Sequence, residues 1–158
     1  MNKTNKILVL GSAPNALEIH KNDLSVYDEI IVINNAWRVL TNWTELIYPY
    51  DFPDERKPPE LGKGQRFVTE LDFVDVQNQF GGFVYAGATM AFTALYWALG
   101  KHRPRHIDIL GCDMVYDDQS KTHFYGNGAA DPLRADLTLR NLDAKSARFL
   151  CLSWMNKC

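Results

Sequence analysis

Short apolar runs alternate along the chain with longer segments that mix apolar and polar residues. The runs at 7–10 and 29–33 are almost continuously apolar and rich in β-branched residues, which is typical of parallel strands covered on both faces. Residues 15–20 between them can begin a helix. This pattern predicts a strand-helix-strand unit at the start of the chain.

Weaker strand patterns follow further along the chain. Residues 48–65 contain four prolines and two glycines, which excludes regular structure over most of that length. A loop of this size in a compact domain either covers a substrate or is a surface loop without a binding role, and the sequence leaves both interpretations open. The remaining strand candidates are, in chain order, 45–48, 66–69, 83–85 and 105–110.

Two helices are expected in the second half. Residues 88–99 are apolar on nearly every face, and Gly100 stands where a C-terminal cap belongs, which predicts a buried crossover helix. Residues 133–150 show an amphipathic pattern with Pro132 at the first turn. Alternating strands and helices predict an α/β fold: a three-layer, Rossmann-like, open and mainly parallel sheet with helices on both faces.

Composition narrows the class of protein. The 158 residues fit a single domain, 1–158, and the net charge of −2 gives no reason to expect a nucleic-acid partner. Three cysteines without CxxC spacing argue against a disulfide framework and a structural zinc site, which favours a cytoplasmic location. Because no apolar stretch reaches the length of about 20 residues that a membrane span needs, we expect none.

Polar residues gather where the strands end. In open parallel sheets, ligands bind at the carboxyl ends of the strands, and the start of the buried helix should face the same edge with free N–H groups. We call this edge of the sheet the rim. Its candidate binding residues are Gly11, Ser12, Asn15, Asn34, Asn35, Gly87, Ala88, Thr89, Gly111 and Asp113.

Several rim residues also have a purely structural interpretation. Ser12 suits a phosphate or a ribose, and equally an N-cap. Asn34 and Asn35 can present amide groups to a base or sugar, or form an Asx-turn. Asp113 fits a ribose hydroxyl or a turn cap, and Thr89 fits a ligand contact or a helix cap.

Candidate catalytic residues follow Asp113. His123 can serve as a general base, although a lone histidine is more often a structural hydrogen-bonding residue. Tyr116 and Tyr125 can donate hydrogen bonds to an anionic leaving group. Trp37, just beyond the asparagine pair, packs in a core or stacks on a base. No metal-ligand pattern stands out, so we expect no metal site.

The order of these motifs resembles a known family. A strand followed by GSAPN, a strand followed by NN, then YAGATMAFTALYWALG, IDILGCD and HFYG is similar to the bacterial sialyltransferases of glycosyltransferase family 42. It is similar more loosely to a Rossmann-like group that includes an archaeal pterin pyrophosphokinase. The family pattern has a G-x-G-P-S turn, an Asn after the second strand, an S-G-x-x-M helix start and a G-x-D strand end.

The resemblance implies a nucleotide-sugar fold that binds a cytidine monophosphate (CMP)-linked sugar, a glycan acceptor and no metal cofactor. It places Gly11, Ser12 and Asn15 at the nucleotide phosphate and neighbouring donor groups, and Asn34 or Asn35 at the donor. Residues 87–89 contact the cytidine side with Asp113 close by, and Tyr116 and Tyr125 stabilise the departing phosphate. The reaction is an inverting displacement in which a base takes the proton of the acceptor hydroxyl.

The chain departs from that pattern in the histidine segment. HFYGNG has Asn127 near the place of the family's second histidine, so His123 corresponds to either the base or the first, structural histidine. Two rival functions therefore stay open: a phosphoryl transferase related to the pyrophosphokinases, which needs a divalent cation, and a nucleotide-binding module without catalysis.

The sequence also leaves the assembly open. Phe80, Phe83 and Phe92 suit a homo-oligomer interface as well as a core. The ending CLSWMNKC is abrupt, and the chain is shorter than the resembling enzymes, which predicts a truncated reading frame.

Overall fold

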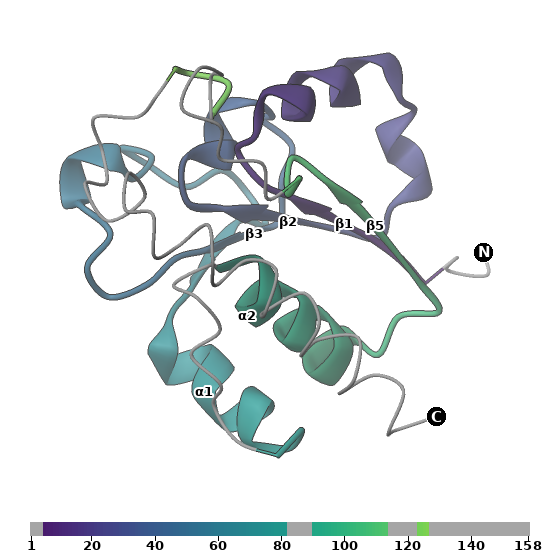
Figure 1. Ribbon diagram of the computed structural model, residues 1–158, viewed down its shortest axis with the longest axis vertical. Coiled ribbons are helices and arrows are strands. Elements are labelled where there is room, and N and C mark those ends of the chain that lie inside the picture. Colours follow the sequence, from purple (N-terminus) through teal and green to yellow (C-terminus); the bar gives the residue numbers. More distant parts are fainter. Residues whose placement is uncertain (1–4, 82–89, 114–122, 127–158) are drawn as a thin grey trace.

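The computed structural model of the protein describes residues 5–81, 90–113 and 123–126. Within them, five parallel strands form one sheet in the order β4-β3-β2-β1-β5 (Figure 1). The predicted open parallel α/β sheet is therefore confirmed. The strands are β1 (Lys6–Leu10), β2 (Glu29–Ile33), β3 (Glu45–Ile47), β4 (Arg66–Val68) and β5 (His106–Leu110).

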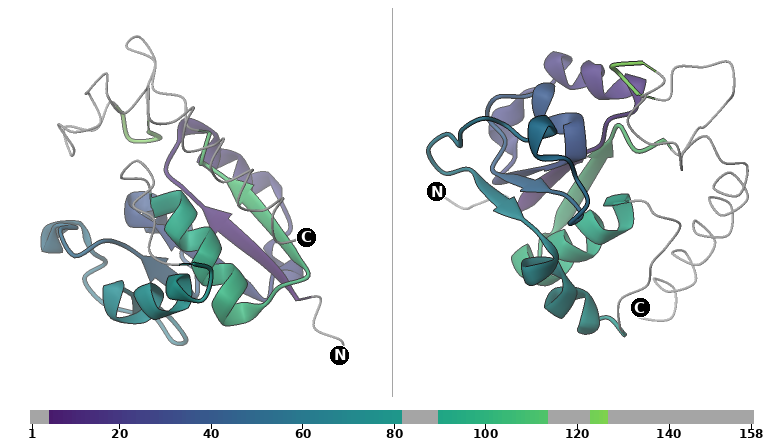
Figure 2. Two further views of the ribbon diagram at one scale, coloured as in Figure 1. Left: turned by 60° about the horizontal axis from the view of Figure 1, so that its bottom comes forward. Right: turned by 90° about the vertical axis from the view of Figure 1, so that its left-hand side faces the viewer.

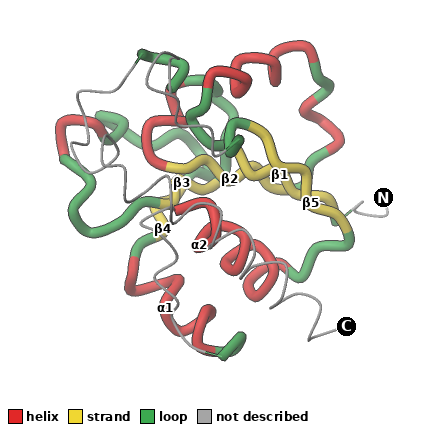
Figure 3. The backbone as a smooth tube through the Cα atoms, in the orientation of Figure 1, coloured by secondary structure: helices red, strands yellow, loops and turns green. Residues whose placement is uncertain are grey.

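Helices cover both faces of the sheet, as Figure 3 shows. The α-helices α1 (Glu70–Asn78) and α2 (Met90–Trp97) pack on one face, and α2 continues into a π-helical turn, η5 (Ala98–His102). Short 3₁₀ helices line the other face, and one more lies in the loop after β3. The 3₁₀ helices are η1 (Pro14–Lys21), η2 (Leu24–Val26), η3 (Asn34–Arg38) and η4 (Asp54–Arg56).

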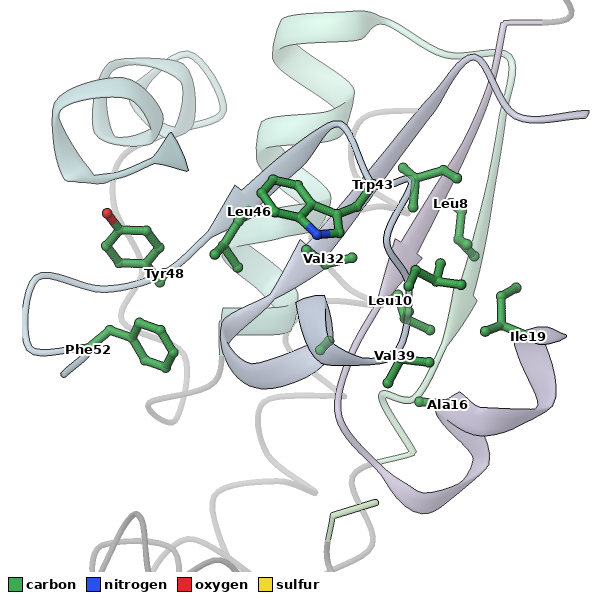
Figure 4. Close-up of a cluster of buried hydrophobic side chains, with 13 residues drawn as sticks. Leu8, Leu10, Ala16, Ile19, Val32, Val39, Trp43, Leu46, Tyr48 and Phe52 are labelled. Atoms are coloured by element: carbon green, nitrogen blue, oxygen red, sulfur yellow. The ribbon is translucent and has the colours of Figure 1, made fainter. Parts of the chain in front are cut away.

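The alternation of side chains along the strands produces two cores. On β1, Leu8 and Leu10 point to the 3₁₀ face, whereas Ile7 and Val9 point to the α-helical face, and all four are at most 1% exposed. Figure 4 shows the first of these cores, in which Trp43 from the approach to β3 packs among aliphatic side chains. Each such side chain stabilises the fold by about 1.5–3 kcal/mol.

A buried carboxylate on β3 fastens η5 to the sheet. Glu45, 3% exposed, accepts hydrogen bonds from Arg66 on one oxygen (2.6 and 3.0 Å) and from the Trp97 indole on the other (2.6 Å). His102 Nε2 lies 3.0 Å from that second oxygen. Burial opposes ionisation of Glu45, but the hydrogen bonds with His102, Trp97 and Arg66 outweigh it and lower its pKa.

The helix expected after β1 is present as the 3₁₀ helix η1, whereas the expected cap of the buried helix was wrong. Gly100 does not cap the buried helix, because η5 continues past it and the left-handed capping residue is Arg103 (φ 49°). A Cβ on Gly100 would overlap Val76 of α1, so this glycine permits close packing of two helices.

The proline-rich loop 48–65 is irregular, as predicted, apart from η4. Two hydrogen bonds attach the ends of this loop to other parts of the chain: the Tyr50 N–H donates to the Glu70 side chain, and the Gln65 side chain donates to the carbonyl of Thr41 (2.9 Å). No helix in the described part of the chain is long and apolar enough to cross a membrane. The predicted strand at 83–85 and helix at 133–150 lie outside the described residues.

Candidate functional site

The floor of the rim is a contact between two glycines. Gly11 follows β1 and Gly111 (φ 73°) follows β5. A Cβ on Gly11 would overlap the Gly111 carbonyl oxygen, and a Cβ on Gly111 would overlap the Gly11 backbone and Ala16. Both positions therefore require glycine so that the two chain segments can touch, whereas the sequence had suggested close approach to a ligand at Gly11.

The first turn of η1 carries no side-chain cap. Its N-cap residue is Ala13 with no capping hydrogen bond, and Pro14 begins the helix. Ser12 precedes the N-cap, so the expected alternative role of Ser12 as the cap does not apply. Asn15 follows in the first turn, and its Oδ1 is shielded from solvent without accepting a hydrogen bond from the described residues.

Asn34 and Asn35 lie where β2 turns into η3. Asn34 adopts a left-handed backbone conformation (φ 51°), which costs energy for a residue other than glycine and is found most often for asparagine and aspartate. Asn35 is 5% exposed and donates from Nδ2 to the Tyr125 hydroxyl (3.2 Å). Neither Oδ1 has a partner among the described residues, so an Asx-turn through these oxygens is absent there.

Residues 123–126 form a tight turn, the HFYG turn, at the same edge of the sheet (Figure 2). His123 and Gly126 exchange backbone hydrogen bonds of 3.2 and 3.0 Å. The Phe124 N–H donates to the Ser12 carbonyl (2.9 Å), and the Phe124 ring packs against the core of the 3₁₀ face. The turn thus joins the end of β1 to the end of β2 through Tyr125 and Asn35.

His123 and Tyr125 stack within this turn. Their ring centroids lie 4.9 Å apart with an interplanar angle of 26°, and His123 is 5% exposed. Phe124 meets Tyr125 edge to face, also at 4.9 Å. The stacking holds the phenol whose hydroxyl accepts from Asn35, so His123 positions Tyr125 whatever further role its imidazole has.

Unpartnered amide oxygens concentrate at the rim. Within the described residues, four buried side-chain oxygens accept no hydrogen bond, and three of them belong to Asn15, Asn34 and Asn35. The fourth belongs to Gln77 on α1. Leaving such a group unpaired costs about 1–3 kcal/mol, and natural structures usually avoid this cost unless a ligand or water takes the place. Most of the unpartnered buried oxygens in the described chain therefore lie at the rim, where a ligand or water can pair with them.

Cys112 and Asp113 complete the rim after β5. Burial, and then the negative charge of Asp113, raise the pKa of the Cys112 thiol to about 12. The thiol stays protonated at neutral pH and is no nucleophile. Asp113 is exposed, so its carboxylate is accessible to a ligand at the outer edge of the rim.

Trp37 makes packing contacts through its ring. Its indole N–H donates to the Arg56 carbonyl in the 48–65 loop (2.8 Å), and the Arg38 guanidinium lies 5.5 Å from the ring centroid. The ring also packs against the core of the 3₁₀ face. Trp37 thereby attaches the proline-rich loop to η3, beside the rim.

The structure brings most of the predicted rim residues to one edge, as the strand-end rule requires. Gly87, Ala88, Thr89 and Tyr116 lie outside the described residues. Sequence reasoning missed Phe124, whose apolar ring in a polar stretch was the available sign of an anchor to the core. Among the described residues, no group of three or more His, Cys, Asp or Glu side chains could hold a metal ion.

No protein family, curated protein or solved structure with which the chain was compared gives a match.

Proposed function

We propose that the rim binds a nucleotide-sugar and that the protein is a sialyltransferase-like glycosyltransferase with a CMP-linked donor. The observation that carries the proposal is the set of unpartnered carboxamide oxygens at the ends of β1 and β2. A ligand rich in hydroxyl and amino groups, such as a nucleotide-sugar, supplies the hydrogen bonds that these oxygens need. The order of the rim motifs supports the choice of donor.

The proposed reaction is a metal-independent inverting displacement. The acceptor hydroxyl oxygen bonds to the anomeric carbon of the donor sugar while the bond from that carbon to the phosphate oxygen breaks. His123 takes the hydroxyl proton, and CMP leaves with the bonding electron pair. Tyr125 accepts a hydrogen bond from Asn35, which leaves its own hydroxyl hydrogen to stabilise the charge on the departing phosphate.

Nucleotide binding is tested first, by thermal unfolding with cytidine, uridine, guanosine and adenosine mono-, di- and triphosphates, each with and without magnesium. A ligand that binds only the folded state raises the Tm, by about 5–10 °C at a hundredfold excess over Kd for a protein of this size. We expect stabilisation by CMP without magnesium. Stabilisation by a triphosphate only with magnesium would replace the proposal by phosphoryl transfer.

Catalysis is tested by hydrolysis of a CMP-linked sugar with the His123→Gln protein. If His123 is the base, hydrolysis falls at least about a hundredfold, since a general base contributes about 10²–10⁴ to the rate, while CMP affinity stays close to that of the wild type. The exposed His20, changed to Gln, is the matched control. Unchanged hydrolysis in the His123 variant removes this residue from the mechanism, and CMP binding without hydrolysis by the wild type indicates a binding module.

A further inference from the structure

The turn after β1 offers few groups to a phosphate. The stretch 11–16 carries five backbone N–H groups, one position being a proline. Three of them already donate to carbonyls: Gly11 to Leu110 (2.8 Å), Ala13 to Gly111 (2.9 Å) and Ala16 to Ala13 (2.9 Å). Phosphate-binding turns depend on several N–H groups that converge on the anion. The turn therefore differs from a phosphate cradle.

The unpartnered side-chain atoms of the same region have the opposite polarity from a phosphate site. The Oδ1 atoms of Asn15, Asn34 and Asn35 are hydrogen-bond acceptors that are shielded from solvent, and Asn35 as a whole is 5% exposed. The oxygens of an ionised phosphate are also acceptors, so they repel carboxamide oxygens. Hydroxyl groups can donate to those oxygens.

We infer that the ends of β1 and β2 bind the hydroxyl-bearing ring of the ligand and not its phosphate. This inference rests on the proposed function and narrows one part of it, because the family resemblance assigns Gly11, Ser12 and Asn15 together to the phosphate and neighbouring donor groups. The hydroxyl of Tyr125 has the complementary polarity: it accepts from Asn35 Nδ2 and keeps a hydrogen for a ligand acceptor. The phosphate therefore lies on the Tyr125 side of the ring.

Two variants of Asn15 separate the two orientations. Asn15→Asp is nearly isosteric and keeps the acceptor oxygen, but it adds a negative charge that repels a phosphate. Asn15→Leu removes the acceptor. The exposed Asn42, changed to Asp, is the control for added charge. The full-length proteins are titrated calorimetrically with CMP.

We expect Asn15→Asp to bind CMP within about threefold of the wild-type Kd, and Asn15→Leu to bind at least about tenfold more weakly. A loss of more than about tenfold in Asn15→Asp, with Asn42→Asp unchanged, overturns the inference and leaves the proposed function standing. Failure of the wild type to bind CMP or a CMP-linked sugar overturns both.

Two further comparisons identify which ring carries the hydroxyls. A wild-type preference of at least about tenfold for CMP over its 2′,3′-dideoxy analogue, lost in Asn15→Leu, assigns the ribose, since sites built to bind a hydroxyl strongly reject the analogue that lacks it. A similar preference for the CMP-linked sugar over CMP assigns the transferred sugar. If the wild type shows neither preference, the inference is wrong.

Discussion

Replacing Glu45 by glutamine tests how much the buried carboxylate on β3 contributes to stability. The wild-type side chain accepts on both oxygens, from Arg66 on one and from Trp97 and His102 on the other. Glutamine has the same shape, but one of its two terminal atoms is a nitrogen that only donates. At least one of the surrounding N–H groups must then face another donor.

The magnitude follows from which partner can reach water. Trp97 is 2% exposed and its indole N–H cannot be rehydrated, so we expect the glutamine oxygen to face Trp97 and the glutamine nitrogen to face Arg66. The variant then loses the charge-assisted hydrogen bonds from Arg66, and a hydrogen bond to a charged group contributes about 1.5–3 kcal/mol. The Arg66 side chain is 42% exposed and can be rehydrated in part, so the expected destabilisation is about 1–3 kcal/mol, a decrease in Tm of roughly 4–8 °C near the middle of that range.

The assay is thermal unfolding of Glu45→Gln beside Asp54→Asn. Asp54 also pairs with a cation, Lys57, but its side chain is 93% exposed, so water screens the pair and we expect its replacement to leave the Tm almost unchanged. Urea unfolding gives the same comparison at 25 °C. Equal Tm values for the two variants would refute the reasoning, because they would show that burial adds nothing to the Glu45 interactions.

Two further predictions concern other parts of the sheet. Gly11→Ala forces a Cβ into the Gly111 carbonyl and should lower the free energy of unfolding, measured in urea, by about 1–3 kcal/mol. Gly62→Ala is the control and should destabilise the protein less, because its Cβ meets only a flexible side chain. Equal effects of the two variants would contradict the packing role of Gly11. Burial opposes ionisation of Asp108 on β5, but hydrogen bonds from Lys6, Tyr27 and His106 outweigh it and lower its pKa from 3.8 to about 2. Because the folded-state pKa is depressed, the stabilisation from the ionised carboxylate is present above about pH 4 and is lost between about pH 4 and 2. The Tm difference between the wild type and Asp108→Asn should therefore disappear over that interval. A Tm difference that stays constant with pH would contradict this prediction.

Much of the sheet was predictable because parallel strands covered on both faces are nearly continuous apolar runs. The run 29–33 matches β2 in full, and the other described strands differ from their predictions by one residue at an end. Helix α1 was missed although Thr69 and Asp72 form a capping box. Its apolar residues stand at 71, 73, 74 and 76 and do not follow the helical period, and Leu71 is 94% exposed, so the helical pattern was weak in the sequence.

The site was predictable as a location and less so as chemistry. The strand-end rule placed Asn34 and Asn35 correctly at the rim, because it depends only on the direction of parallel strands. Their hydrogen-bonding state depends on tertiary contacts, such as that between Asn35 and Tyr125, which are distant in sequence. The role of Gly11 was also beyond sequence reasoning, because a glycine needed for packing and one needed for a ligand have the same local pattern.

The contact between Gly11 and Gly111 has a consequence for the thermodynamics of binding. It joins the ends of the neighbouring strands β1 and β5 backbone to backbone, so the floor of the rim is held by the hydrogen-bonded sheet itself. A ligand that enters the rim meets atoms whose positions are already fixed. Little conformational entropy is then lost from this part of the chain on association, and more of the interaction free energy remains as affinity.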